Sequence, residues 1–243
     1  MALWNTFFPL FDLSQRCAML KGGMSLILAV RDQQDIVMAS DGRVLDEDLS
    51  VMSDDSLKTL ALNAELCLGL AGPTDTMRQV LRSLGIKGVG SHPVDLLGAC
   101  QEMGCPVDVD YRDARDEVTS VLRWMTRRVP VRWRCARIPA VILAGRSYDR
   151  PALCEWSHST RTMEMAGLTG YSEVMVGSLP EEGTREWAEF RWMVRGEQST
   201  HGAEERLTRA VRFCARSFGT GGPVSETVFL RRLSRGFELH RVE

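Results

Sequence analysis

Residues 24–72 carry two hairpin patterns in succession: MSLILAV (24–30), RDQQD (31–35) and IVMASDGR (36–43), then LKTLAL (57–62), NAE (63–65) and LCLGLAG (66–72). Nearly unbroken apolar runs of this length are typical of strands that are buried on both faces. The short polar segment inside each pattern predicts a tight turn between its two runs. The sequence therefore predicts two β-hairpins in this stretch.

The turn of the first hairpin decides which residues of its strands face each other, because antiparallel register follows from the turn. A turn about Gln33 predicts that the numbers of paired residues sum to about 66, which sets Ser25 opposite Asp41. A hydroxyl near the start of one strand is then expected to face a carboxylate at the end of the next.

The second hairpin brings two further groups to its open end. A turn at residues 63–65 places Lys58 beside Leu70, one step before the corner at Gly72. If the two hairpins lie side by side in one sheet, a hydroxyl, a carboxylate, a cation and a backbone amide gather at one edge. These groups belong to Ser25, Asp41, Lys58 and Gly72. Together they are the groups that acyl transfer requires.

These residues resemble the first half of a proteasome β-type subunit. The shared positions are Ser25, Ala29, Ala39-Ser40-Asp41-Gly42-Arg43, Lys58 and Gly69-Leu70-Ala71-Gly72. That family belongs to the N-terminal-nucleophile (Ntn) hydrolases. The resemblance therefore implies the α+β class and a four-layer αββα sandwich, in which two stacked, mainly antiparallel sheets are flanked by helical layers. It extends over about residues 24–242 and is most specific over residues 24–83.

The resemblance implies a role for each group of the predicted site. Ser25 stands where the family has the threonine that begins the mature chain, so it is the candidate nucleophile, and its own amine is the candidate general base. Such an amine has an ordinary pKa near ~8, which suits proton transfer at neutral pH. Asp41 and Lys58 would keep a positive charge near the hydroxyl, and the Gly72 amide would form the oxyanion hole. Arg43 matches an arginine that supports the site.

The second half of the chain contains one departure from the family. Ser178 resembles a serine at a strand end whose hydroxyl supports the amine of the nucleophile. The family then has an aspartate three residues before a Ser-Gly-Gly turn, and the matching positions here are Ser217 and Thr220. Thr220 keeps a hydroxyl, but Ser217 cannot supply the carboxylate. Asp41 would then orient Lys58 alone.

Periodicity predicts the remaining elements. Apolar residues at helical spacing predict a helix that begins after Pro73 and ends at Gly85, and further helices over about 94–103, 111–128, 182–194 and 203–218. Apolar and alternating runs predict strands over 140–145, 152–157, 162–166, 174–178, 227–233 and 237–242. Residues 85–110 form a connection that is longer than in simple members of the family. Strands and paired helices in this order fit stacked sheets covered by helices.

The chain divides into an extension and one domain. Residues 1–24 are predicted to be an N-terminal extension or propeptide, and residues 25–243 a single proteasome-like Ntn-hydrolase domain. Three interpretations of the extension remain open. It is removed before Ser25, or it is retained as a docking segment, or translation starts at Met24 and removal of that methionine exposes Ser25.

Composition excludes several classes of function. A net charge of −2 gives no basic field for nucleic acid, and no apolar run approaches the ~20 residues of a membrane span. Seven scattered cysteines without a CxxC motif fit reduced thiols in the cytoplasm. Cys100, Cys105 and His92 share one loop but lack a fourth ligand for zinc. We therefore expect no metal, no other cofactor, no nucleic-acid partner and no membrane partner.

Two functions from different classes fit this sequence. The first is a peptidase that forms rings of identical subunits and cleaves peptides or unfolded proteins. Compared with the threonine of the family, Ser25 keeps the nucleophilic hydroxyl but lacks the methyl group that restricts its rotamer, so slower turnover is expected. The second is a catalytically inactive structural subunit, and a transpeptidase or ligase of the same fold is a further alternative. Taken singly, each residue also has an ordinary explanation: Asp41 as a turn residue, Lys58 as a solvated cation and Gly72 as a corner.

Overall fold

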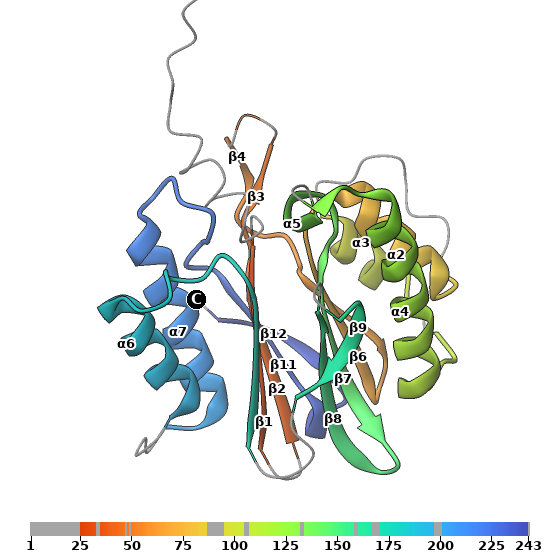
Figure 1. Ribbon diagram of the computed structural model, residues 1–243. Helices are drawn as coiled ribbons and strands as arrows, with labels where there is room; N and C mark the ends of the chain where they lie inside the picture. The colour runs from red at the N-terminus through yellow and green to blue at the C-terminus, as the bar shows by residue number, and fades with distance from the viewer. Residues whose placement is uncertain are drawn as a thin grey trace, which may run out of the picture.

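The computed structural model describes residues 25–32, 35–46, 48, 50–86, 95–104, 107–131, 134–157, 160–166, 171–196 and 201–242. The extension expected over residues 1–24 lies outside these residues. So do His92 and Cys105 of the long connection. The described residues form a mixed α+β fold with antiparallel sheets, as the sequence predicts (Figure 1).

Within the described residues, the first five-stranded sheet has the order β10-β1-β2-β11-β12, and all of its neighbouring strands are antiparallel. Its strands are β1 (Leu26–Asp32), β2 (Asp35–Asp41), β10 (Ser172–Gly177), β11 (Val228–Arg232) and β12 (Glu238–Val242). The first predicted hairpin is therefore the centre of this sheet. It is joined on both sides by strands from the end of the chain.

The second five-stranded sheet of the described residues has the order β5-β6-β7-β8-β9, again antiparallel throughout. Its strands are β5 (Thr59–Asn63), β6 (Leu66–Ala71), β7 (Ala140–Ser147), β8 (Arg150–Ser157) and β9 (Thr162–Met165). The second predicted hairpin begins this sheet. A short ribbon of β3 (Val44–Leu45) and β4 (Val51–Ser53), which the sequence did not predict, comes between the two hairpins in chain order. It projects beyond the end of the first sheet, at the top of Figure 1.

The expectation that the two hairpins share one sheet is wrong. The first hairpin pairs with β10 and β11 and the second with β7, so the hairpins belong to different sheets. The sheets face each other, and a shared apolar cluster that includes Ile27, Met38, Ile142 and Leu153 fills the space between them. The residues of the predicted site therefore meet at one end of two facing sheets and not along one sheet edge.

The predicted register of the first hairpin is also wrong, by one residue. Ile27 pairs with Ser40, so the numbers of paired residues sum to 67. Asp32 pairs with Asp35, which leaves a two-residue loop in place of a turn centred on Gln33. In the second hairpin Thr59 pairs with Gly69, and the Leu70 N–H donates to the Lys58 carbonyl at 2.9 Å, as predicted.

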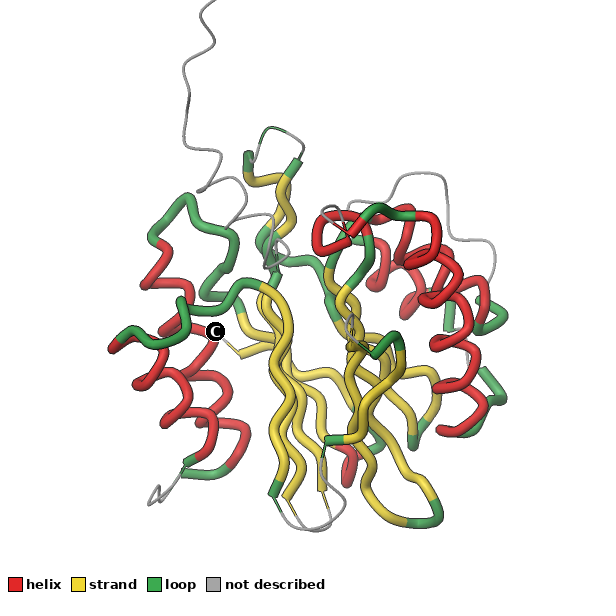
Figure 2. The backbone as a smooth tube through the Cα atoms, viewed as in Figure 1, coloured by secondary structure: helices red, strands yellow, loops and turns green. Residues whose placement is uncertain are grey.

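The described helices fall into two groups, one on the outer side of each sheet (Figure 2). Helices α6 and α7 accompany the first sheet, and α2, α3 and α4 accompany the second. Their bounds are α2 (Thr74–Ser83), α3 (Leu96–Glu102), α4 (Tyr111–Arg128), α6 (Arg185–Arg195) and α7 (Ala203–Phe218), with short turns α5 (Arg134–Arg137) and η2 (Leu233–Arg235). The predicted bounds of the helices at 111–128 and 203–218 are confirmed, and α6 begins three residues later than predicted.

Strand β1 shows why the opening run of the sequence is apolar without interruption. Leu26, Leu28 and Val30 face a core shared with α6 and α7, where they meet residues such as Phe190. The alternate residues of β1, Ile27 and Ala29, face the core between the sheets. Both faces of the strand are therefore buried, and no position in the run tolerates a charge.

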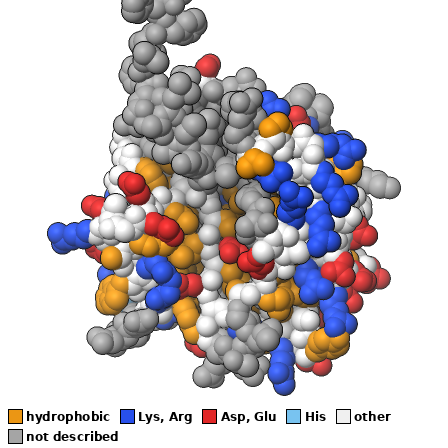
Figure 3. Space-filling model, viewed as in Figure 1, with side chains coloured by type: hydrophobic (Ala, Val, Ile, Leu, Met, Phe, Trp, Pro, Cys, Tyr) orange, Lys and Arg blue, Asp and Glu red, His pale blue; other side chains and the backbone are white. Residues whose placement is uncertain are grey.

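None of the described helices combines the length and the apolarity that a membrane span requires. Figure 3 shows basic side chains gathered on the side of the molecule that carries α2 and α4. The exposed arginines of α4 are Arg112, Arg123, Arg127 and Arg128.

Candidate active site

A small pocket opens at the end of the two sheets where the predicted site residues meet. Its volume is about 110 Å³, and Ser25, Lys58 and Gly72 all line it. These residues come from the start of β1, the approach to β5 and the exit from β6. Most of the remaining wall is apolar, from Val44, Leu45, Leu57, Pro73, Met77 and Leu96. The hydroxyl-bearing Ser25, the amine-bearing Lys58 and the backbone of Gly72 thus line one cavity.

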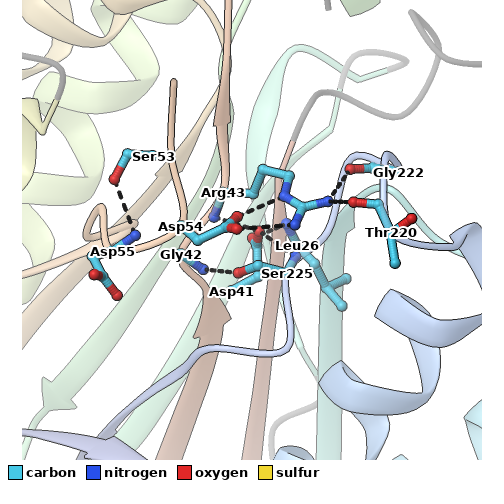
Figure 4. Close-up of polar contacts among 10 residues, drawn as sticks. All are labelled: Leu26, Asp41, Gly42, Arg43, Ser53, Asp54, Asp55, Thr220, Gly222 and Ser225. Atoms are coloured by element: carbon cyan, nitrogen blue, oxygen red, sulfur yellow. Dashed lines mark hydrogen bonds and ion pairs between the residues drawn. The ribbon is translucent and has the colours of Figure 1, made fainter. Parts of the chain in front are cut away.

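Asp41 is not among the residues that line this pocket, but its carboxylate joins three segments of backbone, one of them next to Ser25. One carboxylate oxygen accepts the N–H of Leu26 at 2.8 Å, and the other accepts the N–H groups of Arg43 at 2.9 Å and Ser225 at 3.3 Å. The side chain is fully buried. Because Leu26 follows Ser25 directly, the first of these bonds fixes the backbone next to the candidate nucleophile (Figure 4).

Ser25 is held from the other side by the end of β10. The Ser178 N–H donates to the Ser25 carbonyl at 2.9 Å. Gly177, which has φ of +107°, leaves room for this carbonyl, because an added Cβ would lie 1.7 Å from it. Ser178 therefore contacts Ser25 through its backbone, and its carbonyl in turn accepts the Cys214 thiol at 3.7 Å. The predicted role of its hydroxyl toward the Ser25 amine stays a prediction.

Arg43 forms a clamp between the two halves of the chain. Its guanidinium makes a double contact with the Asp54 carboxylate, at 2.6 and 3.1 Å, and donates to the carbonyls of Thr220 and Gly222 at 2.9 and 2.8 Å. Planar double contacts of this kind are among the stronger hydrogen bonds in proteins. Arg43 thus ties the loop after α7 to the segment between β2 and β5 (Figure 4).

Lys58 is buried, with 6% of its surface exposed, so it is not the solvated cation that an isolated lysine usually is. Burial lowers the pKa of its ammonium below the usual value, and the negative charges of Asp41 and Asp95 partly oppose this. Burial likewise raises the pKa of Asp41, opposed by Lys58 and by the three N–H donors. Two buried groups of opposite charge therefore depend on each other to stay ionised.

Thr220 and Ser217 do not line the pocket. Both residues are exposed. The Thr220 carbonyl accepts a hydrogen bond from Arg43. The Ser217 hydroxyl donates to the Phe213 carbonyl of its own helix at 2.9 Å. The resemblance also implied that Asp41 alone would orient Lys58. Asp95 adds a second negative charge that acts on Lys58 besides that of Asp41; the orienting role of Asp41 stays a prediction.

Three residues of the site escaped prediction from the sequence. Ser225 donates its N–H to Asp41 and accepts the Gly42 N–H on its hydroxyl at 3.1 Å. Asp54 pairs with Arg43, and Asp95 caps α3.

The composition of the chain also singles out Lys58: the sequence has three lysines, Lys21, Lys58 and Lys87, among 30 residues that are lysine or arginine. A chain that uses arginine almost everywhere else buries one of its few lysines here.

Gly72 has a backbone conformation that only glycine adopts easily. Its φ is +145°, and an added Cβ would lie 2.9 Å from the Pro139 Cα. The residue therefore lets the chain turn sharply from β6 into α2 against the start of β7. Its peptide group lines the pocket because of this corner.

If the Gly72 amide is the oxyanion donor that the resemblance implies, Gly72→Ala should reduce peptide hydrolysis about 10²–10³-fold, because the clash with Pro139 shifts this amide. The measurement is kcat/KM with a fluorogenic peptide. Gly85→Ala is the matched control: Gly85 also has a positive φ, of +82°, but an added Cβ would meet nothing within 4 Å. It carries the same kind of backbone strain and should keep full activity. Equal activity of the two variants would remove Gly72 from the site.

No family model matches this sequence, and no curated protein matches it. Among the described residues, no group of three or more His, Cys, Asp or Glu side chains is arranged to hold a metal ion.

Proposed function

We propose that this chain is a proteasome-like peptidase of the Ntn-hydrolase type, with Ser25 as its nucleophile. The observation that supports this most is the single pocket that Ser25, Lys58 and Gly72 line together, with Asp41 bound to the backbone beside Ser25. These residues come from four separate elements of two facing sheets. A candidate nucleophile, a cation and a backbone N–H donor that lie close together are the arrangement by which a candidate active site is recognised.

The mechanism requires that Ser25 be the first residue of the working chain. Its neutral amine accepts the proton of its own hydroxyl while Oγ attacks the peptide carbonyl. The Gly72 amide stabilises the oxyanion, and the Lys58 ammonium favours the ionised hydroxyl. The protonated amine then gives its proton to the leaving amine, and an acyl-enzyme forms. Water, activated by the same amine, releases the acyl group and restores Ser25.

The same proposal includes the fold and the assembly. We infer that the two sheets and their outer helices correspond to the four-layer αββα sandwich of the Ntn hydrolases. Packing of the sheets face to face, with helices on both outer sides, supports this inference. Rings of identical subunits, substrates that are peptides or unfolded proteins, and a cytoplasmic location follow from the resemblance and belong to the proposal.

The pocket also suggests which substrates to use. Its wall beyond the reacting groups is mainly apolar, and its volume of about 110 Å³ suits a side chain of moderate size. A peptide with leucine before the scissile bond is therefore the first substrate to test. Its carbonyl has to reach Ser25 while the side chain contacts residues such as Leu57 and Leu96.

The pH dependence of hydrolysis tests this proposal. Activity should rise as pH passes the amine pKa near ~8, because only the neutral amine is a base. As pH rises further, activity should fall again, and this fall should begin before pH 10.5. Burial lowers the pKa of Lys58 from 10.5, and neutral Lys58 no longer favours the ionised hydroxyl. A bell-shaped profile of kcat/KM is expected. Hydrolysis that keeps rising beyond pH 10.5 would exclude charged Lys58 from the mechanism.

A catalytically inactive structural subunit is the second candidate. The observation that favours it is Ser217, which stands where the family has an aspartate, and whose hydroxyl bonds to its own helix. On this alternative, no peptide would be cleaved at any pH, and residues 1–24 would stay attached. Hydrolysis that depends on Ser25 would exclude it.

A further inference from the structure

Asp95 occupies a particular place between helix α3 and the segment that carries Lys58. It is the N-cap of α3, and one of its carboxylate oxygens accepts the Gly98 N–H at 2.7 Å. The same oxygen accepts the Leu57 N–H at 3.1 Å. Leu57 directly precedes Lys58, and both line the pocket with Leu96, the first residue of α3. One carboxylate thus joins the helix start to the backbone of the buried lysine.

The first turn of α3 is shaped around this carboxylate. A Cβ at Gly98 would lie 2.1 Å from the Asp95 Oδ2, so a side chain at position 98 would compete with the carboxylate for space. An N-cap needs one bond to the helix, which serine or asparagine provides as well as aspartate. The second bond, to Leu57, is not part of capping and links the cap to the proposed site.

We propose that Asp95 is a positioning residue for Lys58: its carboxylate anchors the backbone immediately before Lys58 and adds a second negative charge near the ammonium. This inference rests on the proposed function, since the position and charge of Lys58 matter to catalysis through the Ser25 hydroxyl. Asp95 takes this role from the side of α3. Asp41 acts from the side of β2, where it also binds three backbone N–H groups.

The electrostatic surroundings of Lys58 support the need for two carboxylates. Burial is the largest influence on the pKa of Lys58 and lowers it, while Asp41 and Asp95 raise it, Asp41 more strongly. Beyond Asp41 lies the Cys214 thiol of α7, whose pKa is raised to about 12, so it adds no charge at neutral pH. The two carboxylates are therefore the negative charges that the described surroundings offer to Lys58.

The scarcity of lysine makes this inference directly measurable. The sequence has three lysines, so a chain labelled with carbon-13 at lysine Cε gives three side-chain NMR signals. Lys58→Arg removes one signal and thereby assigns it. The Lys58 signal is then followed from about pH 7 to 11 in the full-length chain, which reads the pKa of the ammonium without any need for activity.

Asp95→Asn is expected to move the Lys58 titration to lower pH, because the amide keeps an oxygen for Gly98 and Leu57 but carries no charge. Asp41→Asn should move it further in the same direction. Asp110→Asn is the matched control: Asp110 caps α4 through the N–H groups of Arg112 and Asp113 and is not among the charges that act on Lys58. It should leave the Lys58 titration where it is.

Asp95→Ser guards against an effect of the amide itself, because serine also caps helices and has no charge. It should shift the titration as Asp95→Asn does. In the active enzyme, the alkaline limb of kcat/KM should move to lower pH with the same variants. An unchanged or higher Lys58 pKa in both Asp95 variants would overturn the inference. Absence of hydrolysis in the wild-type chain would refute the proposed function instead, and the NMR titration distinguishes these two failures.

Discussion

Replacing Ser25 with alanine is expected to reduce peptide hydrolysis by more than about 10³-fold, because no other group in the mechanism forms the acyl-enzyme. The substitution removes one buried hydroxyl and creates almost no cavity. The chain should therefore fold as before, and its thermal unfolding should stay close to that of the wild type. Lost activity in a folded chain is the signature of a nucleophile.

Ser40→Ala is the matched control for this experiment. Ser40 is also fully buried, lies on β2 next to Asp41, and its hydroxyl has no hydrogen-bond partner in the described structure. Its loss should leave kcat/KM within a few-fold of the wild-type value. A Ser25→Ala variant that hydrolyses the leucine peptide as fast as Ser40→Ala would refute Ser25 as the nucleophile.

The second large effect concerns stability. Asp41→Ala is expected to lower the free energy of unfolding by about 3–5 kcal/mol, because the buried ammonium of Lys58 loses the stronger of the two negative charges that act on it. The N–H groups of Leu26, Arg43 and Ser225 also lose their acceptor. Urea denaturation measures the change, with an unchanged slope showing that the same surface is exposed on unfolding.

Two comparisons make this prediction specific. Asp55→Ala breaks an exposed ion pair with Arg241, whose atoms lie 2.8 Å apart, and should cost at most about 1 kcal/mol. The double variant Asp41→Ala with Lys58→Met removes the uncompensated charge as well, so it should recover part of the lost stability. A loss for Asp41→Ala no greater than that for Asp55→Ala would mean that Asp41 is not the electrostatic centre of this site.

Local patterns in the sequence sufficed to predict the hairpins and most helices. Apolar periodicity over 111–128 coincides with α4, and the turn predicted at residues 63–65 gives the correct register of β5 and β6 as far as Ala61. Beyond Ala61 the register shifts, and Asn63 pairs with Leu66 instead of lying in the turn. These features depend on residues close together in sequence. The register of the first hairpin was wrong by one residue because RDQQD does not decide between a turn centred on Gln33 and a two-residue loop.

The pairing between hairpins was not predictable in the same way. Strand β1 pairs with β10, and β2 pairs with β11, through contacts between residues more than a hundred positions apart. Each hairpin has two apolar faces, and its turn forms equally well whether the two hairpins share one sheet or belong to different sheets. Only the full set of strands decides the arrangement, and it separates the hairpins into facing sheets.

The proximity of the four predicted residues could be inferred from the sequence, but the residues that hold them in place could not. The spacing of Ser25, Asp41, Lys58 and Gly72 reflects two hairpins whose ends meet, and this survives the change from one sheet to two. Asp95 carries an N-cap signal and nothing that connects it to Lys58, because that link depends on how α3 packs against β5. Charged partners that come from distant elements are visible only in three dimensions.

The central claim is that Ser25 is the nucleophile and supplies its own amine as the base. The intact mass and the N-terminal sequence of the protein purified from its own host test this claim most directly. The account predicts a chain that begins at Ser25, whether by cleavage of residues 1–24 or by loss of Met24. A chain that still begins at Met1 or Ala2 and stays so over days would leave the amine within a peptide bond and contradict the claim.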